Sequence, residues 1–231
     1  HLPEEPWFYQ FDWDAVIYFD ERQSFIKKVY KNSYYIPFPC GPWRKGNIKT
    51  SRKKLNLPLD KKIILCFAQR GYTSYLPDLP DHVLRDTILL ILVKKGEARD
   101  ILETYSGNPN IMVREEEVLS WERLDEYVFA SDAVILHKFK SRRYAVVSST
   151  IFQLLGTGKP FLVPKHSDFF RPLRNEVLKY GDHIELGQLI MEVFRKSKRV
   201  KKTLRSVRSY VEKYSTRKVA SSFLKLFKRI C

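Results

Sequence analysis

The chain has 231 residues, 44% of them hydrophobic, with only 9 glycines and 12 prolines. This composition excludes a disordered or low-complexity chain and supplies enough apolar side chains for a hydrophobic core. The formal net charge of +16 predicts attraction to polyanions such as nucleic acid, anionic lipid or a phosphate-bearing substrate, with a solvated basic helix face as the alternative.

The cysteines and histidines exclude the common metal and disulfide scaffolds. Cys40, Cys66 and Cys231 cannot all pair and lack metal-ligand spacing, so we expect no disulfide framework, no zinc site and a reducing cytosol. The five histidines form no metal-binding pattern. No apolar run approaches the roughly 18 residues of a membrane-spanning helix. We therefore expect a cytoplasmic globular protein without a cofactor. Its start at His1 rather than Met suggests truncation or processing.

Short apolar runs alternate with stretches of helical spacing along the whole chain. This alternation is typical of βαβ units and a parallel sheet. Buried strands are expected at residues 15–19, 63–67, 88–93, 111–113, 133–136 and 161–163. Helices are expected at residues 23–30, 99–105, 116–130, 149–155 and 185–196, with one or two long helices over 203–229. The chain should therefore form an α/β domain with helices on both faces of a parallel sheet.

A proline-rich segment, residues 36–42, follows the first expected strand. Its three prolines exclude a helix or a central strand. The strand before it has no evident partner nearby, so we interpret the segment as a linker between two lobes. Residues 51–55 then begin a short helix that ends before Pro58.

An ordered series of short motifs resembles a known domain. Residues 67–71, Phe-Ala-Gln-Arg-Gly, stand where that domain has a Phe-x-Gly-Arg turn. Residues 127–136 are similar to its Tyr-x-x-Ala-Asp-Val-x-Val strand, and residues 152–161 to its Glu-Ala-x-Ala-x-Gly-x-Pro helix end. Over residues 12–230 the chain resembles the C-terminal domain of retaining GT-B glycosyltransferases, the glycogen-synthase-like group 1 family, with an archaeal member indicated.

The resemblance implies a domain plan and a function. Residues 1–40 would be the end of an N-terminal lobe and a hinge, and residues 41–200 a Rossmann-like domain that binds a nucleoside-diphosphate sugar. Residues 201–231 would be basic helices that pack back on the N-terminal segment. The chain would be a glycosyltransferase, or the donor-binding part of one. The rest of its N-terminal lobe would be missing or supplied by a partner chain.

Two departures from the family pattern leave enzymatic activity open. The family's paired glutamates correspond to Ala145 and Gln153. The amide oxygen of Gln153 can take part of the ribose-binding role of the second glutamate, whereas Ala145 cannot replace the first, which lies near the sugar. The family also places a lysine a few residues after the arginine that corresponds to Arg70, and this chain has none there.

The expected donor pocket lies where segments after the strands meet the start of a helix. In a doubly wound sheet these segments share one edge, where basic side chains and free amides oppose a diphosphate. The candidate donor-binding residues are Arg70, Gly71, Val113, Arg114, His137, Lys138, Arg142, Arg143, Ser148, Ser149, Thr150 and Gln153. Simpler interpretations remain open, because residues 148–150 form an ordinary capping signal, residues 70–71 an ordinary turn, and His137 an ordinary strand end.

The basic C-terminal stretch suggests further partners. From Arg195 to the end there are 14 lysines and arginines and one acidic residue, Glu212. Contact with an anionic membrane surface is one interpretation. A nucleic-acid-binding protein on a Rossmann-like fold is the alternative function, supported by the charge and by aromatic residues such as Tyr34 and Trp43, although no nucleic-acid motif is present.

Overall fold

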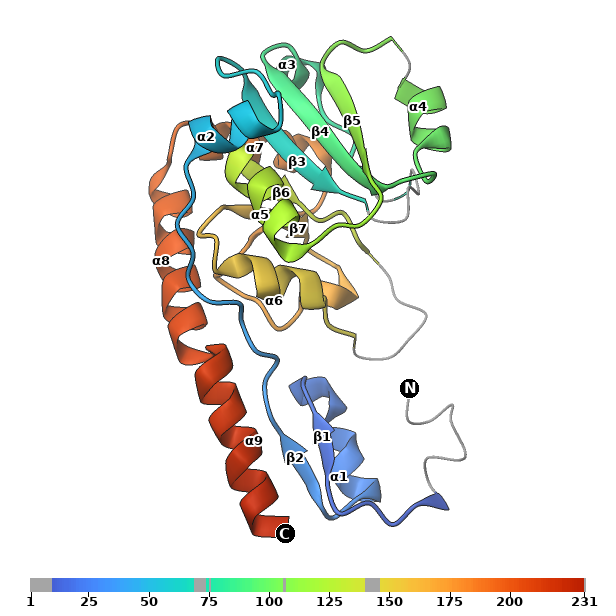
Figure 1. Ribbon diagram of the computed structural model, residues 1–231, viewed down its shortest axis with the longest axis vertical. Helices are drawn as coiled ribbons and strands as arrows, with labels where there is room; N and C mark the ends of the chain where they lie inside the picture. Colours follow the sequence, from blue (N-terminus) through green and yellow to red (C-terminus); the bar gives the residue numbers. More distant parts are fainter. Residues whose placement is uncertain (1–9, 69–73, 75, 106, 140–145, 231) are drawn as a thin grey trace.

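The computed structural model describes residues 10–68, 74, 76–105, 107–139 and 146–230. Its centre is a six-stranded sheet, and every neighbouring pair of strands is parallel. The strands lie in the order β5 (Ile111–Glu116), β4 (Thr87–Lys94), β3 (Lys62–Phe67), β6 (Ala133–Ile135), β7 (Phe161–Pro164) and β8 (Leu178–Tyr180). The expected parallel sheet is confirmed (Figure 1).

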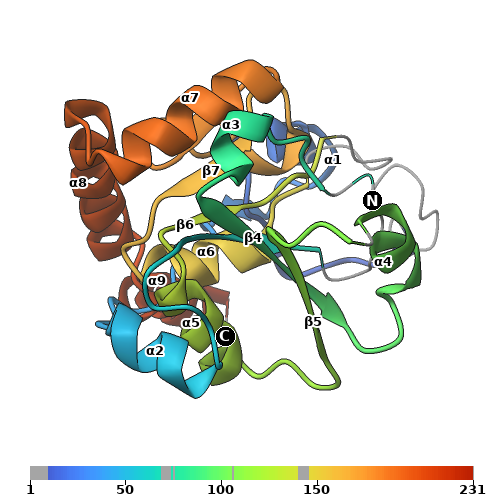
Figure 2. The same ribbon diagram turned by 90° about the horizontal axis from the view of Figure 1, so that it is seen from above.

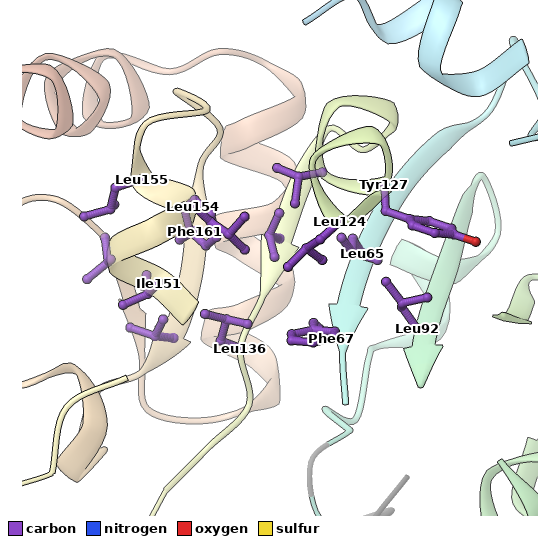
Figure 3. Close-up of a cluster of buried hydrophobic side chains, with 14 of the residues drawn as sticks. Leu65, Phe67, Leu92, Leu124, Tyr127, Leu136, Ile151, Leu154, Leu155 and Phe161 are labelled. Carbon is purple, nitrogen blue, oxygen red and sulfur yellow. The ribbon is translucent and has the colours of Figure 1, made fainter. Parts of the chain in front are cut away.

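Helices cover both faces of this sheet (Figure 2). Alternate side chains of β3 point to opposite faces, Leu65 into one apolar cluster and Ile64 into the other, as the pleat of a strand requires. Strands buried on both faces read as continuous apolar runs, which explains why the sequence identified them. One face packs on α5 (Trp121–Ala130) and α6 (Ser149–Leu155), as Figure 3 shows. The other packs on α3 (Asp81–Leu84), α4 (Arg99–Tyr105) and α7 (His183–Phe194).

The expected helix over residues 116–130 is wrong in its first part. Strand β5 continues to Glu116 because β4 is eight residues long and offers Val93 and Lys94 as partners for its last two residues. The helix α5 begins only at Trp121, after Ser120, whose hydroxyl accepts a hydrogen bond from the Arg123 amide. A serine in this position is a strong start signal for a helix.

The N-terminal segment forms a second, smaller sheet. Strand β1 (Val16–Tyr18) pairs in parallel with β2 (Ser33–Tyr35), and η3 (Glu21–Phe25) and α1 (Ile26–Val29) connect them. The expectation that the first strand has no partner nearby is therefore wrong, because β2 lies directly before the proline segment. Its Ser-Tyr-Tyr sequence lacks the apolar alternation that marks a half-buried strand.

The two terminal helices, α8 (Lys198–Lys213) and α9 (Thr216–Ile230), run along one side of the molecule (Figure 1). Val219 and Leu226 of α9 pack with Ile36, and Ile17 and Tyr34 of the small sheet join the same cluster. Helix α9 thus contacts the N-terminal segment, whereas Val207 and Val211 of α8 belong to a core cluster of the large sheet. Within the described residues, no helix combines the length and the apolar character needed to cross a membrane.

The proline segment is hydrogen-bonded to the junction of α8 and α9 through both backbone groups of Cys40. The Cys40 amide donates to the Tyr214 carbonyl at 2.8 Å, and the Thr216 hydroxyl donates to the Cys40 carbonyl at 2.9 Å. The chain therefore passes between the two sheets beside the junction of α8 and α9. The proline segment and the junction of α8 and α9 are far apart in the sequence, but they lie side by side here. Together they connect the small sheet to the large one.

The segment Gly156 to Pro160 follows the end of α6 and precedes β7, as expected for a helix end rather than for a phosphate-binding loop before a helix. The Gly158 amide donates to the Leu155 carbonyl at 3.0 Å, and Gly158 has a φ of +66°. Glycine tolerates this left-handed conformation at the end of a helix, where side chains with a Cβ are disfavoured. Strand β7 starts directly afterwards at Phe161.

Candidate functional site

The carboxyl edge of the large sheet is where the fold favours a ligand. From β3 the chain first adds β4 and β5 on one side and then β6, β7 and β8 on the other. The direction of the connections therefore reverses between β3 and β6. In open parallel sheets the ligand crevice lies outside the carboxyl ends of the strands at this reversal. The residues that follow β3 and β6 are consequently the candidate site.

His137 lies at the end of β6, as expected, and is neutral near pH 7. Its Nδ1 is 2.7 Å from the hydroxyl of Tyr180, at the end of β8, and its ring packs edge-on against Phe139. Burial lowers the pKa of His137 to about 4, and the nearby Asp78 carboxylate only partly opposes this shift. A neutral imidazole can exchange hydrogen bonds with a ligand but supplies no positive charge for a phosphate.

Lys138 brings positive charge to the same edge. Its Nζ lies 5.9 Å from the centre of the Phe169 ring, in the segment that follows β7. Phe169 also connects this segment to α6, because its carbonyl accepts a hydrogen bond from the Ser148 amide at 3.3 Å. The segments that follow β6 and β7 therefore meet the start of α6 at one place.

The exposed face of α6 carries three of the candidate residues. Ser149, Thr150 and Gln153 are exposed or half-buried, whereas Ile151 and Phe152 are buried. Positions three and four residues apart share a helix face, so Gln153 lies on the same side as the two hydroxyl residues. The three side chains therefore share one surface of α6.

Ser148 differs from the expectation in one respect. It occupies the N-cap position of α6, but its side chain makes no capping hydrogen bond and is buried. A cap hydroxyl that leaves the amides of the first turn free keeps them available to another acceptor. With only seven residues, α6 adds little dipole, so an anion here would depend mainly on basic side chains.

Gln153 also touches the linker through its backbone. Its carbonyl accepts a hydrogen bond from Arg44 Nη2 at 2.9 Å, and the same guanidinium pairs with Asp125 of α5, with Nε 2.6 Å from Oδ2. Arg44, two residues after the linker, therefore attaches this part of the chain to α5 and α6. The position of Gln153 is set by the same contacts.

Val113 and Arg114 lie farther from the reversal than the other candidates. They sit inside β5 rather than after it, paired with Ile91 and Leu92 of β4, so the expected strand end at Val113 is wrong. Strand β5 is at the edge of the sheet, separated from β3 by β4. At about 4.8 Å per strand, it is roughly 10 Å from β3.

Four candidates and one family position fall outside the described residues. Arg70 and Gly71 belong to residues 69–73, and Arg142, Arg143 and Ala145 belong to residues 140–145. Among the described residues, no group of three histidine, cysteine, aspartate or glutamate side chains is placed to hold a metal ion.

Two residues at this edge were missed by the sequence analysis. Tyr180 lies on β8, a strand that the period-two pattern Leu178-Lys179-Tyr180 before Gly181 could have revealed. Arg22 of η3 donates to the carbonyls of Val146 at 3.0 Å and Asp168 at 3.1 Å, and it also pairs with Asp20. No sequence signal identified Arg22 as a contact between the small sheet and the large one.

A cavity of about 580 Å³ lies beside this contact, and none of the candidate donor-binding residues lines it. It is open to solvent and is lined by the η3 region, by the segment 171–176 and by the C-terminal half of α8. Its wall combines Arg174 and Lys213 with Glu21, Glu176 and tyrosine hydroxyls. The sequence analysis did not anticipate this cavity.

The low pKa of His137 predicts a specific pH dependence of stability. The unfolded chain binds a proton near pH 6.5 and the folded chain only near pH 4. The resulting stability is therefore complete above about pH 6.5 and is lost as the pH falls toward 4. Because the ring is partly exposed, we expect a loss on the order of 1–2 kcal/mol. Urea unfolding at pH 7 and pH 4.5 should show this loss in the native chain but not in His137→Gln. The same change at His183, on the surface, should leave the native pH dependence intact.

No family model matches the chain, but solved structures share its fold. A sucrose-phosphate synthase from Thermosynechococcus elongatus superposes with a TM-score of 0.65 at 14% identity, over 94% of this chain and 58% of that one. A glycosyltransferase from Rickettsia africae gives a TM-score of 0.64 at 14% identity, over 94% and 63%. WaaG, a glycosyltransferase involved in lipopolysaccharide biosynthesis, gives 0.57 at 13% identity, over 86% and 58%.

These neighbours establish the fold class. The chain has the α/β fold of GT-B glycosyltransferases, with a six-stranded parallel sheet and helices around it. It spans between 58% and 63% of the length of the three structures. What these enzymes bind and transfer does not follow from the fold alone.

Proposed function

We propose that this chain is the nucleotide-sugar-binding part of a two-lobed glycosyltransferase. One observation carries the proposal: the reversal between β3 and β6 gathers Lys138, His137 and the exposed face of α6 at one edge of a fold shared with glycosyltransferases. Ligands of such sheets bind outside this reversal. The same neighbours make a transferase a better account of the fold than a nucleic-acid-binding protein.

The diphosphate of the donor would be met by basic side chains. Lys138 follows β6, and Arg70, Arg142 and Arg143 belong to the segments after β3 and β6. Arginine binds phosphate oxygens through two parallel hydrogen bonds, and lysine through a single charge. The amides at the start of α6 and the hydroxyls of Ser149 and Thr150 would complete the phosphate contacts.

The ribose would lie against Gln153. Its amide oxygen can accept a hydrogen bond from a ribose hydroxyl, and its amide group can donate one. A neutral acceptor forms a weaker bond than a carboxylate. We therefore expect weaker donor binding than a glutamate at this position would give.

Transfer of the sugar requires more than this donor site. Ala145, at the family position expected near the sugar, has no carboxylate. The small sheet of β1 and β2 has only two strands, and in this proposal it is the end of a second lobe. A sheet of two strands is marginal by itself. We propose that the rest of the N-terminal lobe comes from a longer chain or from a partner chain, and that the chain alone binds the donor without detectable transfer.

Isothermal calorimetry with UDP and GDP tests the donor site. At least one of the two should bind, and Arg70→Ala should weaken this binding about tenfold or more, because a charge-assisted hydrogen-bond pair is lost. Gln153→Ala should weaken nucleotide binding about three- to tenfold, the value of one hydrogen bond, and leave pyrophosphate binding unchanged.

Arg195→Ala serves as the matched control, because it removes the same charge from the exposed end of α7. It should leave nucleotide affinity unchanged. Absence of binding to either nucleotide, or equal losses in Arg70→Ala and Arg195→Ala, would show that the donor site has been assigned wrongly.

A further inference from the structure

The helices α8 and α9 present a strongly basic outer surface. They follow one another along one side of the molecule (Figure 1). The 14 basic residues from Arg195 onward are accompanied by a single acidic residue. On α8, exposed Lys198, Lys202 and Arg205 recur at a spacing of four and three residues, which places them on one helix face.

Helix α9 carries more apolar surface than the small sheet covers. Its buried stripe, Val219 and Leu226, packs against the small sheet. A second stripe consists of Ala220, Leu224 and Phe227, at positions i, i+4 and i+7 of the same helix. Leu224 is 59% exposed and Phe227 48% exposed. An apolar leucine and phenylalanine therefore lie next to each other on an open face.

Basic side chains border this exposed stripe. Lys228 lies one turn after Leu224, and Arg217 lies three residues before Ala220, so both lie on the same side of the helix as the exposed stripe. Lys218 and Lys225 lie beside Arg217 and Lys228, one step farther around the helix from the exposed stripe. The arrangement is an apolar stripe with a basic margin, which is the pattern of helices that lie in a membrane interface.

We propose that the exposed face of α9 docks on an anionic lipid bilayer, with Leu224 and Phe227 inserted at the boundary between headgroups and acyl chains. The charge of the bilayer surface complements the basic margin, and α8 adds attraction at longer range. Nucleic acid would satisfy the positive charges equally well but offers no apolar phase for Leu224. The observations therefore favour lipid, and this inference does not depend on the donor site.

Flotation with vesicles tests the docking surface. The native chain should float with vesicles of phosphatidylcholine and phosphatidylglycerol at low salt and should not float with phosphatidylcholine alone. The affinity of the double variant Leu224→Ser/Phe227→Ser for the anionic vesicles should be lower by about tenfold or more, because the apolar side chains no longer insert. Lys225→Glu/Lys228→Glu should cause a similar loss through charge.

The matched control removes exposed apolar groups elsewhere. Val118 and Trp121 are 80% and 52% exposed and lie outside the C-terminal helices, so Val118→Ser/Trp121→Ser should bind like the native chain. Three outcomes would overturn the proposal. The native chain could fail to float, or it could retain duplex DNA in preference to vesicles. The Leu224→Ser/Phe227→Ser variant could also float normally while losing self-association or binding of the missing N-terminal lobe, which would identify a protein interface.

Discussion

Replacing Arg52 by alanine is expected to lower the free energy of unfolding by about 3–5 kcal/mol, the usual cost of removing one partner of a buried ion pair. The side chain of Arg52 is only 5% exposed and pairs with Asp132 at 2.8 Å. Its other nitrogens donate to the carbonyl of Ala130 at 2.8 Å and to that of Lys61 at 2.7 Å. Without the guanidinium, the carbonyls of Ala130 and Lys61 lose this donor, and the Asp132 carboxylate keeps only the Ile63 amide at 2.9 Å and Lys62 Nζ at 3.5 Å.

Urea unfolding of Arg52→Ala, Arg52→Lys and Lys53→Ala measures this contribution. Lysine is a single point charge that cannot reach all three acceptors, so Arg52→Lys should recover only part of the loss. Lys53 is exposed on the same helix, and its change should stay within about 0.5 kcal/mol. Equal stability of Arg52→Ala and Lys53→Ala would contradict the structural role assigned to Arg52.

Replacing Gly156 by alanine is expected to destabilise the chain by about 2–3 kcal/mol, near the top of the usual range for overpacking. The new Cβ would lie 2.1 Å from the carbonyl oxygen of Pro42 and 2.6 Å from that of Gly41. Both are backbone atoms, so the linker itself would have to move. That movement would also strain the hydrogen bond from the Arg44 amide to the Gly156 carbonyl, which is 2.7 Å long.

Gly181→Ala is the matched control for this change. Its Cβ would meet only Glu185 Oε2 at 3.4 Å, the end of a flexible side chain, so little destabilisation is expected. Thermal unfolding of the two variants should differ clearly. If both melt at the same temperature, the linker is not held against the end of α6.

The sequence revealed the central strands because they are buried on both faces. The continuous apolar runs of β3 and β4 leave little ambiguity. The short strands β2 and β8, of three residues each, were missed. For β2 no local pattern marks the strand, because its pairing depends on its neighbours, whereas β8 has a period-two pattern too short to stand out. Whether the C-terminal region held one helix or two was also open, because the break at Ser215 depends on its pairing with Cys40.

The candidate site was predictable to the extent that strand order determines it. Residues after β6 and at the start of α6 could be placed at one edge from the alternation of strands and helices alone. The neutrality of His137 could not, because it results from burial beside Tyr180, 43 residues away in sequence. Similarly, the end of β5 depended on the length of β4, which placed Val113 and Arg114 inside a strand.

The most direct test of the donor site is a crystal structure of the chain with a bound nucleoside diphosphate. We predict the diphosphate outside the carboxyl ends of β3 and β6, near Lys138 and the first turn of α6, with the ribose beside Gln153. A nucleotide bound instead in the cavity between Glu21, Arg174 and Lys213, or at the outer edge of β5, would contradict this account.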